Sequence, residues 1–392
     1  MKQLWTPSRR QVLAGGATLL GTSILGSRGL KAAEAADTVR VYGISSMALK
    51  DWDAFTELTG LKMEFTPVTY DTGTYVREIV GNDIGSIADI FIFTGNTPRV
   101  LAPAGAYTPI DVDDPRIALW KQIPDTYKLT ADCTYDGKVY GVPIVNNADS
   151  FGFWPSEIGV TDPRAPLSWE LMFESEKTKG RVALDRSFTY SMSVMAQWVK
   201  QSGQAPIDNP ADLKPEEAKA VADYGIARKR AGQFRTFFSS LDEQVDLLAR
   251  KEVIVLNCWE PCIKEVNNQV GADSVFYAYS DYYYQWGDAA YVSPSVTAND
   301  RWDIVFKTLN FFMGAGGAYR ALQAVDRGYG GPNMDLAIAY ARAQNWPAER
   351  IAELEAVGTK VDTKFKVPDF WGQSSPEHAD VMEEEWQRFL NA

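Results

Sequence analysis

The chain has 392 residues, and its hydrophobic content of 45% and charged content of 23% are typical of a globular protein large enough for two domains. Its net charge of −12 argues against nucleic acid and anionic membrane surfaces as partners. Three cysteines exclude a disulfide scaffold, although Cys258 and Cys262 could pair if their geometry allows. The chain has a single histidine, His378, so a Ser-His-Asp mechanism would depend entirely on that residue. We expect no metal site and no cofactor.

Residues 1–35 have the pattern of an export signal. Arg9 and Arg10 precede a weakly apolar run, rich in glycine and alanine, that ends near Leu25. Small residues around Ala33 and Ala35 suit signal cleavage. The paired arginines favour the twin-arginine route to the periplasm, and the run is too short to anchor the chain in a membrane. No later segment is apolar enough to span a bilayer.

Strands and helices alternate after the signal. We expect strands at 38–42, 61–68 and 88–93 and helices at 48–58 and 72–80, with another helix after Thr97. This alternation predicts an α/β fold with a parallel sheet, and ligands bind such sheets at the carboxyl ends of strands. The polar residues at those ends are Ser45, Ser46, Thr94 and Asn96.

A polar tract inside an apolar stretch follows a predicted hairpin at Asp136 and Gly137. The tract runs from Asn146 to Ser150 and includes Asp149, which indicates a strand that crosses between two domains. A second α/β unit then runs to about Tyr284, with a strand that ends at Asp185. Further helices are expected at 190–201, 215–231, 241–250, 302–313, 317–325, 333–342, 347–356 and 378–390.

Two predicted strands near the middle of the chain each adjoin a tryptophan with a carboxylate close by. Trp259 and Glu260 follow the first strand, and Trp286 and Asp288 precede the second. An aromatic face beside a carboxylate suits a cation, because the ring quadrupole attracts the charge and the carboxylate neutralises it. We therefore predict a cation site in this stretch.

Two other kinds of function stay open on the residues alone. Helix N-termini at Ser45–Ser46 and Thr94–Thr97 would suit an anionic group of another solute, such as an amino acid, a phosphonate or a sugar derivative. Paired acids could make a carbohydrate-active enzyme, although the usual nucleotide, zinc-protease and hydrolase motifs are absent from the mature chain. The acids available for such a pair are Asp149, Asp185, Glu260 and Asp288.

The order of these features resembles the periplasmic solute-binding proteins of ABC importers, and within them the spermidine/putrescine-binding group. The resemblance rests on the first strand leading into Ser45–Ser46, the segment Ala88–Asp89–Ile90, the hairpin 137–143, Ser168–Trp169, Trp286–Gly287–Asp288, and Gly328–Tyr329 with Pro332–Asn333. It implies two α/β lobes of the type II periplasmic binding protein fold, joined by crossing hinge strands, with one small ligand held in the cleft.

The resemblance also implies roles for individual residues. Trp286 and Asp288 match a ring wall and an amine-binding carboxylate, and Trp259 and Tyr329 match ring positions. Asp185 stands at a strand end where the family places an acid, and Gln373 matches a glutamine of the tail.

Three departures from the family pattern indicate a changed amine ligand. The first loop, Ile44–Ser45–Ser46, carries neither ring nor acid, and no second acid follows Asp185. Asp149 stands instead where the family has a small polar residue. A monoamine or a quaternary amine would fit one lost and one gained acid.

We therefore expect a monomeric binding protein that captures a polyamine or related amine and delivers it to a membrane permease. The expected division is a signal at 1–35, one lobe from 36–146 and 290–335, a second lobe from 147–289, and a C-terminal helical segment at 336–392 that packs on the lobes.

Overall fold

The computed structural model describes residues 38–68, 72–82, 84–94, 96–366, 370–372 and 376–392. The predicted export signal and Gln373 lie outside these residues. Residues 39–392 form one compact unit. No helix among the described residues is long and apolar enough to cross a membrane.

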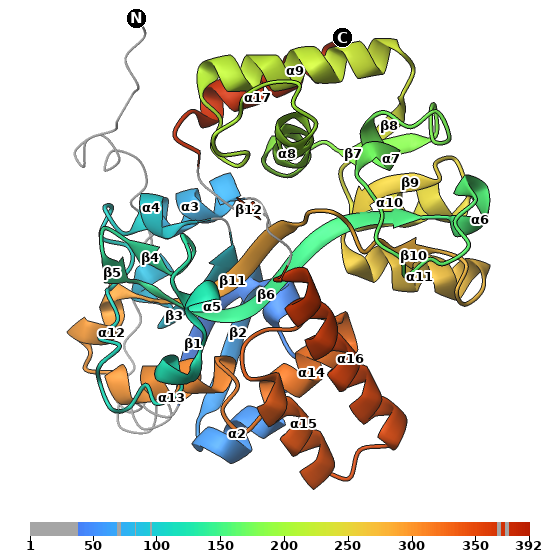
Figure 1. Cartoon of the computed structure of the whole chain (residues 1–392). Helices are drawn as coiled ribbons and strands as arrows, with labels where there is room; N and C mark the ends of the chain where they lie inside the picture. The colour runs from blue at the N-terminus through green and yellow to red at the C-terminus, as the bar shows by residue number, and fades with distance from the viewer. Residues whose placement is uncertain (1–37, 69–71, 83, 95, 367–369, 373–375) are drawn as a thin grey trace, which may run out of the picture. The chain divides into compact units, whose positions relative to one another are not determined.

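A mixed sheet forms the centre of this unit (Figure 1). Its main path runs in the order β2, β1, β3, β11, β6, β9, β7, β8. The bounds of these strands are β1 Thr38–Ile44, β2 Lys62–Val68, β3 Ile90–Thr94, β6 Gly141–Phe153, β7 Val182–Asp185, β8 Phe234–Phe238, β9 Val255–Cys258 and β11 Tyr284–Val292. Four further strands are short. β10 (Phe276–Tyr277) pairs with β6 and β12 (Phe370–Trp371) pairs with β11, whereas β4 (Thr134–Tyr135) and β5 (Lys138–Val139) pair with each other in a separate two-stranded sheet.

Parallel pairs flank an antiparallel centre. β1 is parallel to β3, and β7 is parallel to both β8 and β9, as expected from the alternation of strands and helices. Between them, β11 is antiparallel to β3 and β6, and β6 is antiparallel to β9. The α/β fold predicted from the sequence is confirmed.

Apart from the helix Glu260–Val270 (α11), which was not predicted from the sequence, the longer helices lie close to their expected bounds, with two exceptions. They are α2 Asp53–Thr59, α3 Thr72–Gly81, α8 Ser193–Gln201, α9 Pro215–Arg230, α10 Leu241–Ala249, α11 Glu260–Val270, α13 Trp302–Phe312, α14 Ala318–Arg327, α15 Met334–Ala343, α16 Ala348–Lys364 and α17 Ala379–Asn391. The short helices are α4 Pro98–Leu101, α5 Asp125–Lys128, α6 Pro155–Ile158, α7 Glu170–Phe173 and α12 Pro294–Ala298. The single turns are η1 Ser45–Met47, η2 Ile84–Ser86, η3 Trp120–Gln122 and η4 Phe188–Met192.

The first exception is the helix predicted at 48–58. It begins only at Asp53. Met47, directly before the predicted start, belongs to the turn η1 instead, and its carbonyl accepts a hydrogen bond from the Tyr319 hydroxyl. The second is the helix predicted at 347–356, which continues to Lys364. Its extra turns pack Gly358 against Met334 and Val361 against Gly330, so tertiary contacts outweigh the weak helix propensity of this stretch.

The apolar side chains gather into two large cores. The first core draws on residues 39–145 and 289–319, and the second on residues 151–284 and 382–389. A small alanine-rich cluster joins α14, α15 and α16. Cys133, Cys258 and Cys262 are buried as free thiols, so the Cys258–Cys262 pairing left open by the sequence is not made. The exact lobe boundaries stay a prediction.

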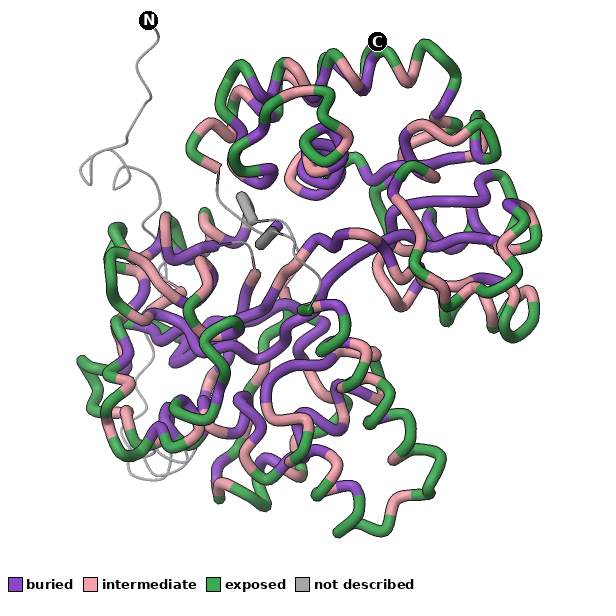
Figure 2. Tube along the Cα trace, viewed as in Figure 1, coloured by how far each residue is buried: buried purple, intermediate pink, exposed green. Residues whose placement is uncertain are grey.

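Only β6 and β11 contribute buried side chains to both large cores among the described strands. All thirteen residues of β6 are buried, which Figure 2 shows along the strand. Its apolar ends belong to the cores, so the polar tract 146–150 lies between them, beside residues 284–287 of β11. This pairing positions the candidate site.

Candidate ligand-binding site

Four residues singled out from the sequence share one face of the central sheet. In the antiparallel ladders, Asp288 lies opposite Thr94, and Tyr284 lies opposite Asp149. Because alternate residues of a strand point to the same face, Trp286 shares that face with Asp288. We call the following set the sheet-face cluster: Thr94, Asn147, Asp149, Tyr284, Trp286 and Asp288.

Asp288 is buried, with only 3% of the residue exposed. It has no cationic partner among the ion pairs of the described residues. Burial and the nearby Asp132 carboxylate raise its pKa to about 8, and the neighbouring Thr94 hydroxyl, which donates to the Gly287 carbonyl at 3.2 Å, has a smaller opposing effect. Asp132, itself buried, accepts a hydrogen bond from the backbone N–H of Asn96. Two carboxyls therefore stand close together at the carboxyl end of β3.

Asp149 is the second buried acid of the cluster, at 4% exposure. Burial raises its pKa to about 7, although Lys364, Trp286 and Tyr277 each lower it. The Tyr277 hydroxyl lies 3.2 Å from Asp149 Oδ1. The Trp286 indole N–H interacts with Asp149 electrostatically, but it is buried without a partner of hydrogen-bond geometry among the described residues.

Trp286 is the ring at the centre of the cluster, and it packs against both large cores. Its ring meets Tyr329 edge to face, with centroids 5.5 Å apart and an interplanar angle of 87°. Arg320, fully buried, holds the loop that follows Tyr329 by donating to the carbonyls of Pro332 and Ile144. Burial lowers the pKa of Arg320 to about 10, so it stays charged at neutral pH.

Glu260 differs from the two aspartates because lysines already compensate it. Lys360 Nζ lies 2.6 Å from Glu260 Oε1, and Lys364 Nζ lies 3.5 Å from Oε2. Burial by itself would raise the pKa of Glu260, but Lys364 and Lys360 lower it to about 2. Glu260 is therefore a carboxylate held by the chain's own cations.

The first-loop serines contact other parts of the chain: the Ser45 carbonyl accepts a hydrogen bond from Arg327 and the Ser46 carbonyl accepts one from Gln323. Ser45 is exposed, whereas Ser46 is buried with a hydroxyl that has no partner among the described residues. The turn η1 has three residues and α4 has four, so few peptide dipoles add up at either N-terminus. The Thr97 side chain makes no capping bond to α4 and contacts the Tyr107 hydroxyl at 3.0 Å.

Asp185 and Trp259 reach different environments. Asp185 accepts a 2.7 Å hydrogen bond from the Ser187 N–H, and burial raises its pKa to about 6. It lies near enough to Tyr284 to raise that phenol's pKa, as Asp149 and Asp132 do, after the larger effect of burial. Trp259 precedes α11, is half-buried and takes part in no ring contact among the described residues.

Four site residues escaped the sequence reasoning: Asp132, Tyr277, Tyr284 and Lys364. Asp132 stands in a loop without a motif, and Lys364 lies some way down a helix whose end was predicted too early. Tyr284 and Tyr277 occur in a tyrosine-rich stretch that also fills the second core. Tyr284 could have been predicted only from the alternation of side chains along β11, which places it on the same face as Trp286 and Asp288, and this requires that the bounds of the strand are known.

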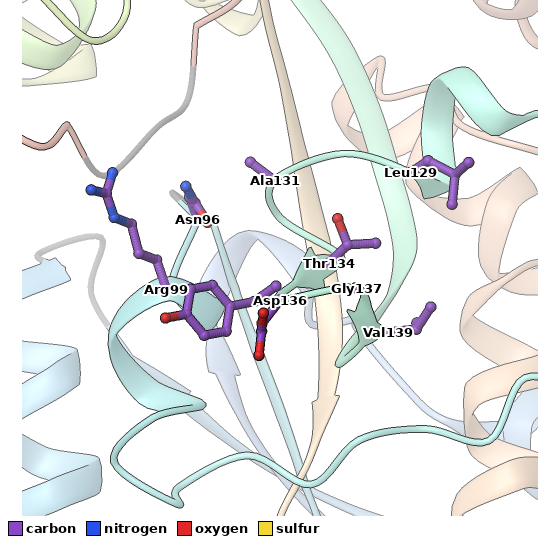
Figure 3. A pocket seen from close by; sticks show the side chains of 9 residues that line it. Asn96, Arg99, Leu129, Ala131, Thr134, Asp136, Gly137 and Val139 are labelled. Carbon is purple, nitrogen blue, oxygen red and sulfur yellow. The ribbon is translucent and has the colours of Figure 1, made fainter.

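A cavity of about 530 Å³ opens beside the site rather than over the sheet-face cluster. Figure 3 shows that its lining comes from the start of α4 and from the β4–β5 hairpin with the segment before it. Asn96 and Arg99 line it, whereas no member of the sheet-face cluster does. Its size suits a small ligand.

Comparison with known families identifies the chain. Residues 52–349 match the model of the bacterial extracellular solute-binding protein family, and the chain belongs to that family. Comparison with curated protein sequences gives no significant match.

Solved structures agree with this assignment. A spermidine/putrescine ABC transporter substrate-binding protein from Streptococcus pneumoniae is similar, with 14% identity, a TM-score of 0.67, and coverage of 91% of this chain and 99% of that one. A periplasmic binding protein of A. tumefaciens in complex with glucopine has 14% identity, a TM-score of 0.59, and coverage of 90% and 99%. A GABA receptor has 16% identity, a TM-score of 0.58, and coverage of 90% and 97%.

These similarities confirm the predicted periplasmic solute-binding protein fold. By its family, the chain is a bacterial extracellular solute-binding protein. Identities this low show the fold alone, and the three relatives carry different solutes in their names.

Proposed function

We propose that this solute-binding protein captures a small organic cation, a polyamine or related amine, on the sheet-face cluster. The observation that supports this most is the pair of buried carboxyls, Asp149 and Asp288, on one sheet face with the Trp286 ring between them. A buried carboxylate is stable only when a cation or several donors compensate it. Asp288 has no cation among its electrostatic partners in the described part of the chain, and a ligand ammonium group would supply that charge.

The rings would complete an amine site. Trp286 and Tyr329 meet edge to face, so they offer two differently oriented walls for methylene groups or for the cation itself. Asp132 adds a second carboxyl beside Asp288. A ligand with two amine groups could reach both the Asp288 end and the Asp149 end of the cluster.

The alternatives have weaker support. An anionic solute would need donors at η1 or α4, and these turns are too short to concentrate backbone dipoles. A carbohydrate-active enzyme would need a protonated acid beside an ionised one at substrate distance, and Glu260 is already held by Lys360 and Lys364. The binding of an amine fits more of the site.

The proposed cellular role follows from the family. The protein would reach the periplasm by the twin-arginine route, bind as a monomer, and pass its solute to the membrane permease. Lobes at 36–146 with 290–335 and at 147–289 would close on the ligand, with β6 and β11 as the hinge and residues 336–392 packed on them.

Calorimetric titration of the mature protein tests the proposal. Putrescine, spermidine and choline are the amine probes, and 4-aminobutyrate, glucose and phosphate are the comparison solutes. We expect heat release with an amine and none with phosphate or glucose. Binding of a comparison solute in the absence of any amine signal would contradict the proposal.

Asp288→Asn is the matched variant for that titration, because it keeps the shape of the side chain and removes its charge. Asp113→Asn, which changes an exposed carboxylate paired with Lys121, is the control. Mass spectrometry of ligand that co-purifies with the native protein would name the solute directly.

A further inference from the structure

Lys364 carries its ammonium group into the same site. It is the last residue of α16 and is only 1% exposed. Its Nζ lies 4.5 Å from the centroid of the Tyr277 ring and 5.9 Å from that of Tyr283. It also lies 3.3 Å from Asn147 Oδ1. Two rings, an amide oxygen and a nearby carboxylate are the surroundings that a bound amine requires.

We infer that Lys364 is a tethered ammonium that occupies an amine subsite of this protein, and that the ammonium group of an incoming ligand displaces it. The subsite is made by Asn147, Asp149, Glu260, Tyr277 and Tyr283. The inference rests on the proposed function and adds the residue that competes with the ligand.

The distances around Glu260 separate a structural lysine from a replaceable one. Lys360 makes a close ion pair at 2.6 Å, whereas Lys364 stands 3.5 Å from the same carboxylate. If Lys364 leaves, Glu260 keeps Lys360 and is not stranded as a buried, uncompensated charge. When Lys364 leaves, Glu260 therefore loses only its longer ion pair and keeps the shorter one with Lys360.

The charge of the subsite is conserved in the exchange. The positive charge of Lys364 lowers the pKa of Asp149. A ligand ammonium at the same position would act in the same way. Burial lowers the pKa of Lys364 itself, so its ammonium gains hydration when it returns to solvent.

A polar group in the subsite is still without a partner. The Nδ2 of Asn147, a fully buried residue, has no hydrogen-bond acceptor among the described residues. Lys364 cannot satisfy this group, because an ammonium group only donates. A ligand that bears an amine and a nearby oxygen could place its ammonium group against the two rings and accept a hydrogen bond from Asn147 Nδ2 through its oxygen.

A tethered competitor reduces apparent affinity by the fraction of time that it occupies the site. Removing it should therefore tighten the binding of free amines. Lys364→Met removes the ammonium group and keeps an apolar side chain, and Lys366→Met, which changes an exposed lysine two residues further on, is the control. We expect Lys364→Met to lower the Kd for putrescine about tenfold or more, with no change in Lys366→Met.

A second measurement does not depend on the natural ligand. Lys364→Ala leaves the subsite without an ammonium group, so n-butylamine should raise the Tm of this variant, whereas n-butanol should not. The wild-type protein and Lys366→Ala should respond to n-butylamine less. Circular dichroism of each variant checks that the fold is retained.

The outcomes separate this inference from the proposed function. Putrescine binding that is unchanged or weakened in Lys364→Met would overturn the inference and leave the proposed function intact. If neither the wild type nor Lys364→Met bound putrescine, spermidine or choline while n-butylamine still stabilised Lys364→Ala, the proposed function would fail and the ammonium subsite would stand. No amine binding and no stabilisation would overturn both.

Discussion

The two ends of β3 bury carboxyls in opposite ways. Asp89, directly before the strand, is fully buried and receives hydrogen bonds from Arg40 at 2.9 Å and from Arg301 at 2.9 Å. Burial alone would raise the pKa of Asp89, but these arginines lower it. At the other end, Asp288 lies opposite Thr94 with Asp132 nearby, and its pKa is raised to about 8.

The difference between Asp89 and Asp288 distinguishes a carboxylate that supports the fold from a carboxyl that is available to a ligand. A buried carboxylate with two arginines is complete in the protein itself, so it supports the fold. A buried carboxyl beside another carboxyl lacks a cation, and perturbed groups of this kind concentrate at binding sites. The contrast is the reason why we propose Asp288, and not Asp89, as the partner of the ligand.

The largest expected effect is on stability at the Asp89 end. Asp89→Asn leaves Arg40 and Arg301 without their carboxylate, and breaking a buried ion pair in this way costs about 3–5 kcal/mol. Chemical unfolding should show that loss in Asp89→Asn and no loss in Asp288→Asn. Equal destabilisation in the two variants would remove the contrast.

The next effect is on affinity at the Asp288 end. Asp288→Asn should weaken amine binding about 10- to 100-fold, because a hydrogen bond to a charged group contributes about 1.5–3 kcal/mol. Calorimetry with the amine that binds the wild-type protein measures this. Asp113→Asn should bind as the wild type does, and an Asp288→Asn variant with wild-type affinity would place the ammonium elsewhere.

The pH dependence of stability sharpens the comparison. Asp288 holds its proton to about pH 8 in the folded protein, whereas the unfolded chain loses it near the ordinary value of 3.8. The folded state therefore binds more protons across this window, so the free energy of unfolding falls as the pH rises, by up to about 1.4 kcal/mol per pH unit. Unfolding curves between pH 5 and 8 should show a shallower slope in Asp288→Asn.

Glu260 should titrate in the opposite sense. Its pKa is lowered to about 2, so its contribution to stability is present above the ordinary value of 4.5 and is lost as the pH falls toward 2. Asp89, also lowered, acts in the same direction. For Asp288, if the free energy of unfolding had the same slope between pH 5 and 8 in Asp288→Asn as in the wild type, other groups would be its cause.

The smallest predicted effect is at the ring wall. Trp286→Leu should weaken amine binding about 3- to 30-fold, because a cation over an indole face contributes about 0.5–2 kcal/mol. Trp302→Leu, which changes a ring stacked on Phe306 in the first core, is the matched control for losing a tryptophan. Stability measurements on the two variants would show whether a loss of affinity comes from the site or from the fold.

Much of the fold could be predicted because local pattern and tertiary contacts agree. The strand at 88–93, the hairpin at Asp136–Gly137 and the helix at 215–231 appear with small shifts of their ends. The helix after residue 347 was predicted too short because Gly358 and Thr359 are weak helix formers. Contacts from Gly330 and Met334 stabilise it, and they are invisible to a local reading.

Some residues of the candidate site could be predicted from the sequence, and others could be placed only by the structure. Trp286 and Asp288 stand two residues apart on one strand, so their shared face follows from the sequence. Asp149 joins them through the register of β6 and β11, which only the structure gives. Lys364 reaches the site from the end of a helix with no motif, so no reading of the sequence would have brought it to Tyr277.

Proton release on binding tests the central claim most directly. Asp288 and Asp149 have pKa values raised to about 8 and about 7, so at pH 7 both are partly protonated before the ligand arrives. An ammonium group that binds them favours their ionised forms. Calorimetry of amine binding at pH 7 in buffers of different ionisation enthalpy should show release of about one proton per ligand. Binding with no proton release, in both the wild type and Asp288→Asn, would contradict the account.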